Sequence, residues 1–263
     1  MLTMAEFRDP ARMLTFQDFE QAQDKPGFVL EAIKHHVASK AYRIACDADL
    51  YDRQMNKTIN AFVKKIYNLS GCKFPDSTAS NNKIACNFFH RLNTQRNMYS
   101  LGAGVSFTDA QGNPASEIDE KLGRHFDHDL QSAAYLALIH GVSFGFWNLD
   151  RLFVFPFTQF CPFWDEHDGT LKAGARFWRL DNSRPLQAVL YEEDGYTRFS
   201  TDGPADTVMQ EVEPKRSYIT TVRKAPADEY PEVIGEENYS SLPVVPLWGS
   251  KLHQSTLVGM REA

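Results

Sequence analysis

The feature that most constrains this chain is a change in the spacing of its apolar residues at Gly141. Before Gly141, apolar residues recur about every four positions, which is typical of amphipathic helices. After it, aromatic and β-branched residues recur with a period of two, and Gly, Asp and Pro mark turns at short intervals. The sequence therefore predicts an α+β protein, with N-terminal helices followed by an antiparallel β meander.

The first helix is predicted over 27–51. Asp24 supplies a cap and Pro26 a first-turn proline, and apolar residues then recur at helical spacing, with an interruption expected near Asp47. A short apolar segment at 62–67 follows, ended by Gly71, and the next stretch is predicted to be a loop.

Two further helices complete the first half. Asn81 is predicted to cap the second, which ends at Gly102 in a left-handed conformation. Its apolar side is expected to consist of Ile84, Phe88, Leu92 and Tyr99. Ser116 opens the third helix, which stops at Gly141.

Seven strands are predicted beyond Gly141. Asp168-Gly169 and Asp194-Gly195 lie between strands, where this dipeptide favours hairpin turns. A polar segment over 225–241 is expected to form a long loop before the apolar stretch 242–248. The predicted strands are Val142 to Asn148, Arg151 to Phe155, Phe160 to Trp164, Ala173 to Leu180, Gln187 to Glu192, Tyr196 to Ser200 and Ser217 to Arg223.

These patterns divide the chain into three parts. Residues 1–141 form a mainly helical part, and 142–250 form a β-rich part. Residues 251–263 begin a helix that Ser255 can cap. Because that helix has barely two turns before Ala263, we expect the chain to be part of a longer polypeptide.

Composition narrows the class of protein. The 263 residues are 43% hydrophobic, as in a globular protein, and no apolar run approaches the about 20 residues that cross a bilayer. The four cysteines lack the paired spacing of a disulfide or zinc framework, so synthesis in the cytoplasm is expected. The net charge of −6 and the lack of basic runs argue against a sequence-reading DNA-binding protein.

Gly141-Val142-Ser143-Phe144-Gly145 matches the G-x-S-x-G pattern of a serine hydrolase. In such enzymes a strand precedes the serine and a helix follows it, whereas here the order is reversed. Asp165 or Asp181 followed by His253 would supply the rest of a triad. A helix cap that leads into a strand is the favoured interpretation, and the hydrolase is the alternative.

No metal or cofactor site is predicted. His125 and His128 are three apart on a predicted helix, but a solvated helix face explains them equally well. His35 and His36 are adjacent, so they diverge on a helix and are expected at the surface.

Several segments together resemble the portal proteins of tailed bacteriophages. They are Asp47-x-Asp49-x-Tyr51-x-Arg53-Gln54-x-Asn56-x-x-Ile59, Lys83-Ile84-x-x-Asn87-x-x-x-x-Leu92, Gly102-x-Gly104, Gly141 to Gly145, and Leu242-Pro243-Val244-Val245-Pro246-Leu247-Trp248. The positions that match the family pattern are Asn56, Asn87, Gly102, Gly104, Gly141, Gly145, Pro243 and Pro246. Their order and spacing are similar to those of the wing region of a portal subunit.

The resemblance implies a structural protein, not an enzyme, that needs no cofactor. It implies self-assembly into a dodecameric ring at one capsid vertex of the virion, with the terminase large subunit and the capsid and head-tail connector proteins as partners. Double-stranded DNA would pass through without being gripped, and an acidic subunit suits such a conduit because it repels phosphates. An unrelated α+β interaction domain is the third interpretation.

Overall fold

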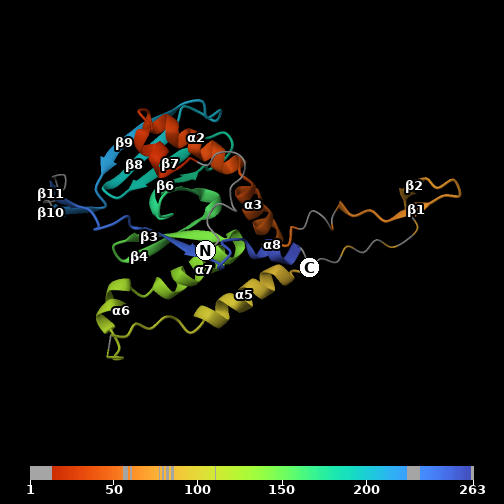
Figure 1. Ribbon diagram of the computed structural model, residues 1–263, viewed down its shortest axis with the longest axis horizontal. Helices are drawn as coiled ribbons and strands as arrows, with labels where there is room; N and C mark the ends of the chain where they lie inside the picture. The colour runs from red at the N-terminus through yellow and green to blue at the C-terminus, as the bar shows by residue number, and fades with distance from the viewer. Residues whose placement is uncertain are drawn as a thin grey trace.

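The computed structural model describes residues 14–55, 59, 61–76, 78, 80, 83, 86–109, 111–223 and 232–261 (Figure 1). Its helices are α1 (Phe16–Gln21), α2 (Lys25–Ala38), α3 (Lys40–Asp52), α5 (Phe88–Leu101), α6 (Ser116–Leu122), α7 (Phe126–His140) and α8 (Thr256–Arg261). Its strands are β1 (Lys65–Tyr67), β2 (Lys73–Pro75), β3 (Val142–Asn148), β4 (Arg151–Pro156), β5 (Phe160–Trp164), β6 (Leu171–Trp178), β7 (Gln187–Glu192), β8 (Gly195–Thr201), β9 (Met209–Arg216), β10 (Ile219–Arg223), β11 (Glu232–Glu237) and β12 (Val244–Trp248). This order confirms the predicted α+β class.

The β-rich half forms more than one sheet. Strands β5 to β9 form a five-stranded antiparallel meander, in sequence order. Strands β3 and β4 instead form a separate sheet with β12, in which β12 pairs antiparallel with β3. The predicted antiparallel meander is confirmed in β5 to β9. The return of β12 across about a hundred residues to pair with β3 was not predicted, because no local pattern encodes that pairing.

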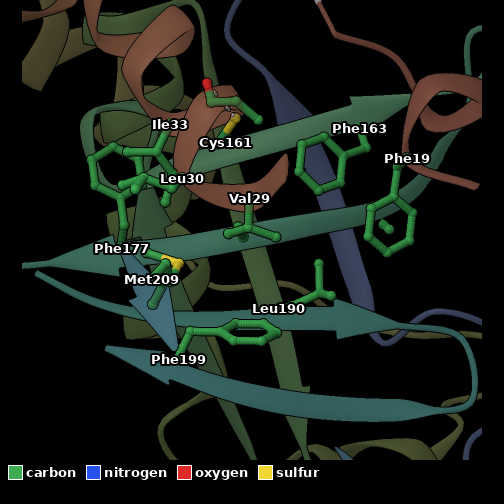
Figure 2. Close-up of a cluster of buried hydrophobic side chains, with 14 of the residues drawn as sticks. Phe19, Val29, Leu30, Ile33, Cys161, Phe163, Phe177, Leu190, Phe199 and Met209 are labelled. Atoms are coloured by element: carbon green, nitrogen blue, oxygen red, sulfur yellow. Dashed lines mark hydrogen bonds between the residues drawn. The ribbon is translucent and has the colours of Figure 1, made fainter. Parts of the chain in front are cut away.

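Alternation along β7, in the middle of the five-stranded sheet, shows how the sequence builds two cores. Ala188 and Leu190 point to one face, where α1 and α2 cover the sheet, while Val189 and Tyr191 point to the other. Figure 2 shows the first core, in which Phe19, Val29, Leu30 and Ile33 face Cys161, Phe163, Phe177, Leu190, Phe199 and Met209. Strand β7, in the middle of the sheet, is thus buried on both faces.

The second core lies between the five-stranded sheet and the β12–β3–β4 sheet. Phe144 and Phe155 from the smaller sheet contact Phe160, with ring centroids 4.3 and 5.8 Å from it. Trp164 stacks on Trp248 of β12 at 5.6 Å. The aromatic run that follows Gly141 therefore fills the space between two sheets, where large rings bury the most area per residue.

The helical half differs from the prediction in where helices begin and end. Asp24 caps α2 through the amide of Gly27, as predicted, but the helix breaks at Ser39 and not near Asp47. Ser39 has an extended backbone, and its hydroxyl caps α3 by accepting from the Tyr42 amide. The third predicted helix is also divided, since Gly123 adopts a φ of +74° between α6 and α7.

The region before α5 differs more strongly from the predicted secondary structure. The apolar segment at 62–67 leads into strand β1, which pairs with β2 in a hairpin, so the predicted short segment and the loop after it are strands in part. Helix α5 begins after Asn87, whose side chain accepts from the His90 amide. Asn81, the predicted cap, lies outside the described residues.

The buried side of α5 was predicted wrongly. Phe88, Leu92 and Tyr99 are 62%, 49% and 95% exposed, whereas Asn93 and Asn97 are buried. The asparagines face α7 and α8, where they form hydrogen bonds, so polar residues occupy the side that hydrophobicity alone would leave in solvent.

Beyond Gly141, strands β3, β5 and β7 have the predicted bounds. Strands β9, β11 and β12 were missed, because β9 and β11 are rich in Glu and β12 contains Pro246. A proline is tolerated in β12 because this strand lies at the edge of its sheet. None of the described helices is long and apolar enough to span a bilayer.

Candidate functional site

Most of the buried polar residues of the helical half lie where α3, α5, α7 and α8 meet. A small apolar cluster of Ala48, Phe89, Ile139 and Leu257, one residue from each helix, forms the centre of this junction. In Figure 1, α8 lies beside α3, with α5 and α7 below. We call this region the helix junction, and buried polar groups from several helices meet there.

A carboxylate on α3 joins two of the other helices. Asp52 Oδ1 accepts a 2.5 Å hydrogen bond from the Tyr135 hydroxyl of α7 and lies 3.0 Å from His90 Nδ1 of α5. The Tyr135 hydroxyl is 2.8 Å from the same imidazole nitrogen. Burial, with the Asp52 carboxylate beside it, raises the pKa of Tyr135, so the phenol stays protonated and donates. These three side chains therefore hold α3, α5 and α7 together.

A second pair lies deeper in the junction. His140, at the last turn of α7, has a side chain that is 1% exposed, and its Nε2 is 2.9 Å from Asp49 Oδ1 of α3. Sequence reasoning missed Asp49 and Asp52 as partners because the groups that they contact lie 38 to 91 residues away along the chain.

Helix α8 is held by the carbonyl end of α7. The Ser255 hydroxyl donates to the Ile139 carbonyl, and Thr256 Oγ1 lies 3.0 Å from both the Leu138 carbonyl and Asn93 Oδ1. These hydroxyls satisfy carbonyls that the end of a helix leaves without an intrahelical partner. The start of α8 is thus part of the fold and not an appendage.

The arrangement around His90 has some features of a catalytic triad. Thr94 Oγ1 is 3.5 Å from His90 Nε2, and His90 Nδ1 contacts Asp52. However, Thr94 lies in the middle of α5, where backbone amides are already bonded within the helix and cannot stabilise an oxyanion. The geometry fits helix packing better than acyl transfer.

Ser143 is equally unsuited to nucleophilic attack. It follows α7 and lies within β3, so the helix precedes the serine and the strand contains it. Its side chain is fully buried, and Oγ donates a 2.7 Å hydrogen bond to the Ala133 carbonyl. His253, the predicted third member, stacks on Trp248 at 3.9 Å. The serine thus fastens the sheet to α7.

We predict that Ser143→Ala will lower the free energy of unfolding by about 1 kcal/mol, because one buried hydrogen bond is lost. A fluorophosphonate probe is expected to label neither wild type nor variant. Stoichiometric labelling of the wild type that disappears in Ser143→Ala would contradict this assignment and favour the hydrolase.

The histidines and acids singled out in the sequence lie apart. His36 is buried against the Phe157 carbonyl at 2.9 Å, so its predicted surface position was wrong. His125, Asp127 and His128 are exposed, so the predicted solvated helix face is confirmed there, and Asp127 accepts from the Val105 amide. Asp129 departs from it, since it is buried against Arg151 at 3.2 Å. The described residues include no cluster of three or more metal-ligating side chains.

The glycines of the family pattern lie where a neighbouring group leaves little room for a Cβ. Gly141 ends α7 with a φ of +94°, as predicted for the helix stop, and a Cβ there would lie 3.0 Å from the Gln254 backbone. A Cβ on Gly145 would lie 2.8 Å from Leu152 Cδ1. Gly102 has a φ of −67°, so the predicted left-handed cap was wrong, and the positive φ of +79° falls at Gly104.

The remaining positions of the family pattern are an asparagine at the helix junction, two prolines in or beside β12, and Asn56. Asn87 caps α5, and its amide donates to the Asp52 carbonyl at 2.7 Å, which brings it to the helix junction. The Pro243 carbonyl accepts from the Trp147 amide, and Pro246 pairs with Phe144. Asn56 lies outside the described residues. The described positions of the family pattern therefore lie at helix ends and in the pairing of β12 with β3.

Known proteins add nothing to this assignment, since no family model and no curated protein matches the chain.

Proposed function

We propose that the chain is a structural subunit of a bacteriophage portal ring, a conduit for DNA packaging and ejection. The resemblance of its segments to portal wing regions suggests the role. In such a ring each copy would dock against its neighbours, the terminase large subunit and the head-tail connector proteins, while duplex DNA passes without being held.

The observation that carries this proposal is the placement of exposed apolar side chains at two opposite ends of the molecule. The β1–β2 and β10–β11 hairpins lie at the two ends of its longest axis (Figure 1). Tyr67 and Leu69 are 63% and 110% exposed at one end, and Val222 and Val233 are each 52% exposed at the other. A ring with head-to-tail contacts needs two different apolar contact surfaces on opposite sides of each subunit, whereas a symmetric dimer needs only one.

The polar groups support the same role. The Ser143 hydroxyl, the Asp52 carboxylate and the His140 imidazole each bond to another element of the fold. These bonds favour a structural role for Ser143 over the hydrolase alternative. A net charge of −6 suits a subunit that lets a phosphate backbone slide past.

The test is the mass of the assembly formed by the chain, measured by native mass spectrometry over a range of protein concentrations. Head-to-tail contacts that close are expected to give one dominant species of more than two copies. A chain that is monomeric at every concentration, or that stops at a dimer, would overturn the proposal.

A further inference from the structure

Each of the two end hairpins is incomplete as a sheet. Strand β1 pairs only with β2, and β10 only with β11, among the residues that the structure describes. A two-stranded hairpin is marginally stable in water, and its outer edges present unpaired amides and carbonyls. Both hairpins therefore need a third strand or another cover.

The two hairpins also expose apolar pairs. Ile66 and Phe74 lie directly opposite each other across β1 and β2 and are 38% and 42% exposed. Val222 and Val233 form the equivalent exposed pair across β10 and β11. Cross-strand apolar pairs stabilise a sheet when a neighbour covers them. Each hairpin therefore offers one apolar surface that a second surface can cover.

The charges of the two hairpins are opposite. Residues 61–76 contain three lysines, Lys64, Lys65 and Lys73, against one aspartate. The described strands of the other hairpin contain three glutamates, Glu232, Glu236 and Glu237, against one arginine. Opposite potentials attract these ends to each other and repel like ends, which sets both partner and direction.

We infer that the β1–β2 hairpin of one copy pairs edge to edge with the β10–β11 hairpin of the next copy, forming a four-stranded sheet between subunits. The inference rests on the proposed ring, since it names the contact that would close it. A single molecule cannot make the contact with itself, because the hairpins lie at opposite ends of its long axis (Figure 1). The partner that pairs with each hairpin is therefore a second copy of this chain.

Charge reversal provides the test. Lys65→Glu with Lys73→Glu makes the first hairpin acidic, and Glu236→Lys with Glu237→Lys makes the second basic. Each double variant alone then carries two like-charged ends and is expected to associate at least tenfold more weakly than wild type in sedimentation velocity. An equimolar mixture of the two variants is expected to regain association, because each end of one variant then meets an oppositely charged end of the other.

Matched controls separate this contact from a general effect of charge. Lys121→Glu with Lys251→Glu, and Glu117→Lys with Glu120→Lys, make the same charge changes at exposed positions outside the hairpins. They are expected to associate as wild type does. Circular dichroism spectra should match across the set, since all substituted side chains lie at the surface.

The outcomes distinguish the two proposals. If wild type assembles and both hairpin variants assemble equally well alone, the hairpin contact is wrong and the ring survives. If wild type never assembles, both fail. If Lys65→Glu with Lys73→Glu leaves association intact but abolishes binding of a single-stranded oligonucleotide, the basic hairpin serves nucleic acid and the inference is overturned.

Discussion

Replacing Gly249 by alanine is expected to lower the free energy of unfolding by about 3 kcal/mol, more than most surface substitutions cost. Gly249 follows β12 and donates its amide to the Gly141 carbonyl at 3.0 Å. A Cβ on Gly249 would lie 2.1 Å from the Ala137 carbonyl oxygen, which is backbone at the end of α7 and cannot rotate away. The strand and the helix would have to separate.

The measurement is urea unfolding followed by circular dichroism, with Gly203→Ala as the control. A Cβ on Gly203 meets nothing within 4 Å, so this variant should unfold within about 0.5 kcal/mol of wild type. Equal stability of Gly249→Ala and wild type would show that β12 does not lie against α7 as described.

Acidification from pH 7 to pH 4 is expected to remove about 3 kcal/mol of stability through one group, His36. Its imidazole donates from Nε2 to the Phe157 carbonyl and lies edge-on to Tyr42 and Phe177. Burial lowers the pKa of His36 to about 4, from an ordinary value of 6.5. The unfolded chain therefore binds more protons than the folded one between these values. The contribution is fully present above pH 6.5 and is lost as the pH falls towards 4.

The variant His36→Gln, which does not titrate, should lack this part of the pH dependence, whatever its stability at pH 7. His35→Gln is the matched control, because His35 is the adjacent residue and its side chain is 43% exposed. Unfolding curves at half-unit steps of pH give the comparison. The account of His36 fails if His36→Gln retains the wild-type slope between pH 6.5 and 4.

The parts of the fold that the sequence predicted are those with a local cause. Gly141 ends a helix because its φ of +94° suits glycine, and β7 has a continuous apolar run because both of its faces are buried. Asp194-Gly195 joins β7 to β8, as such a dipeptide should. Each of these signals lies within a few residues of the structure that it produces.

The errors arise where distant contacts decide. The exposed side of α5 contradicts local hydrophobicity, because Asn93 and Asn97 are buried by α7 and α8 while Phe88 faces solvent. The Asp52–Tyr135 bond joins residues eighty-three apart, and no spacing rule reveals it. The candidate site was therefore predictable at Gly141 and at the Ser255 cap, but not at Gly102, at the cap of α5 or in its buried polar pairs.

The central claim is that copies of this chain meet head to tail through two different ends. Electron microscopy of the assembled chain tests it most directly. The account predicts closed rings with an axial channel, in which the β1–β2 end of each subunit points towards the β10–β11 end of its neighbour. Two-fold symmetric particles that join identical ends would contradict it.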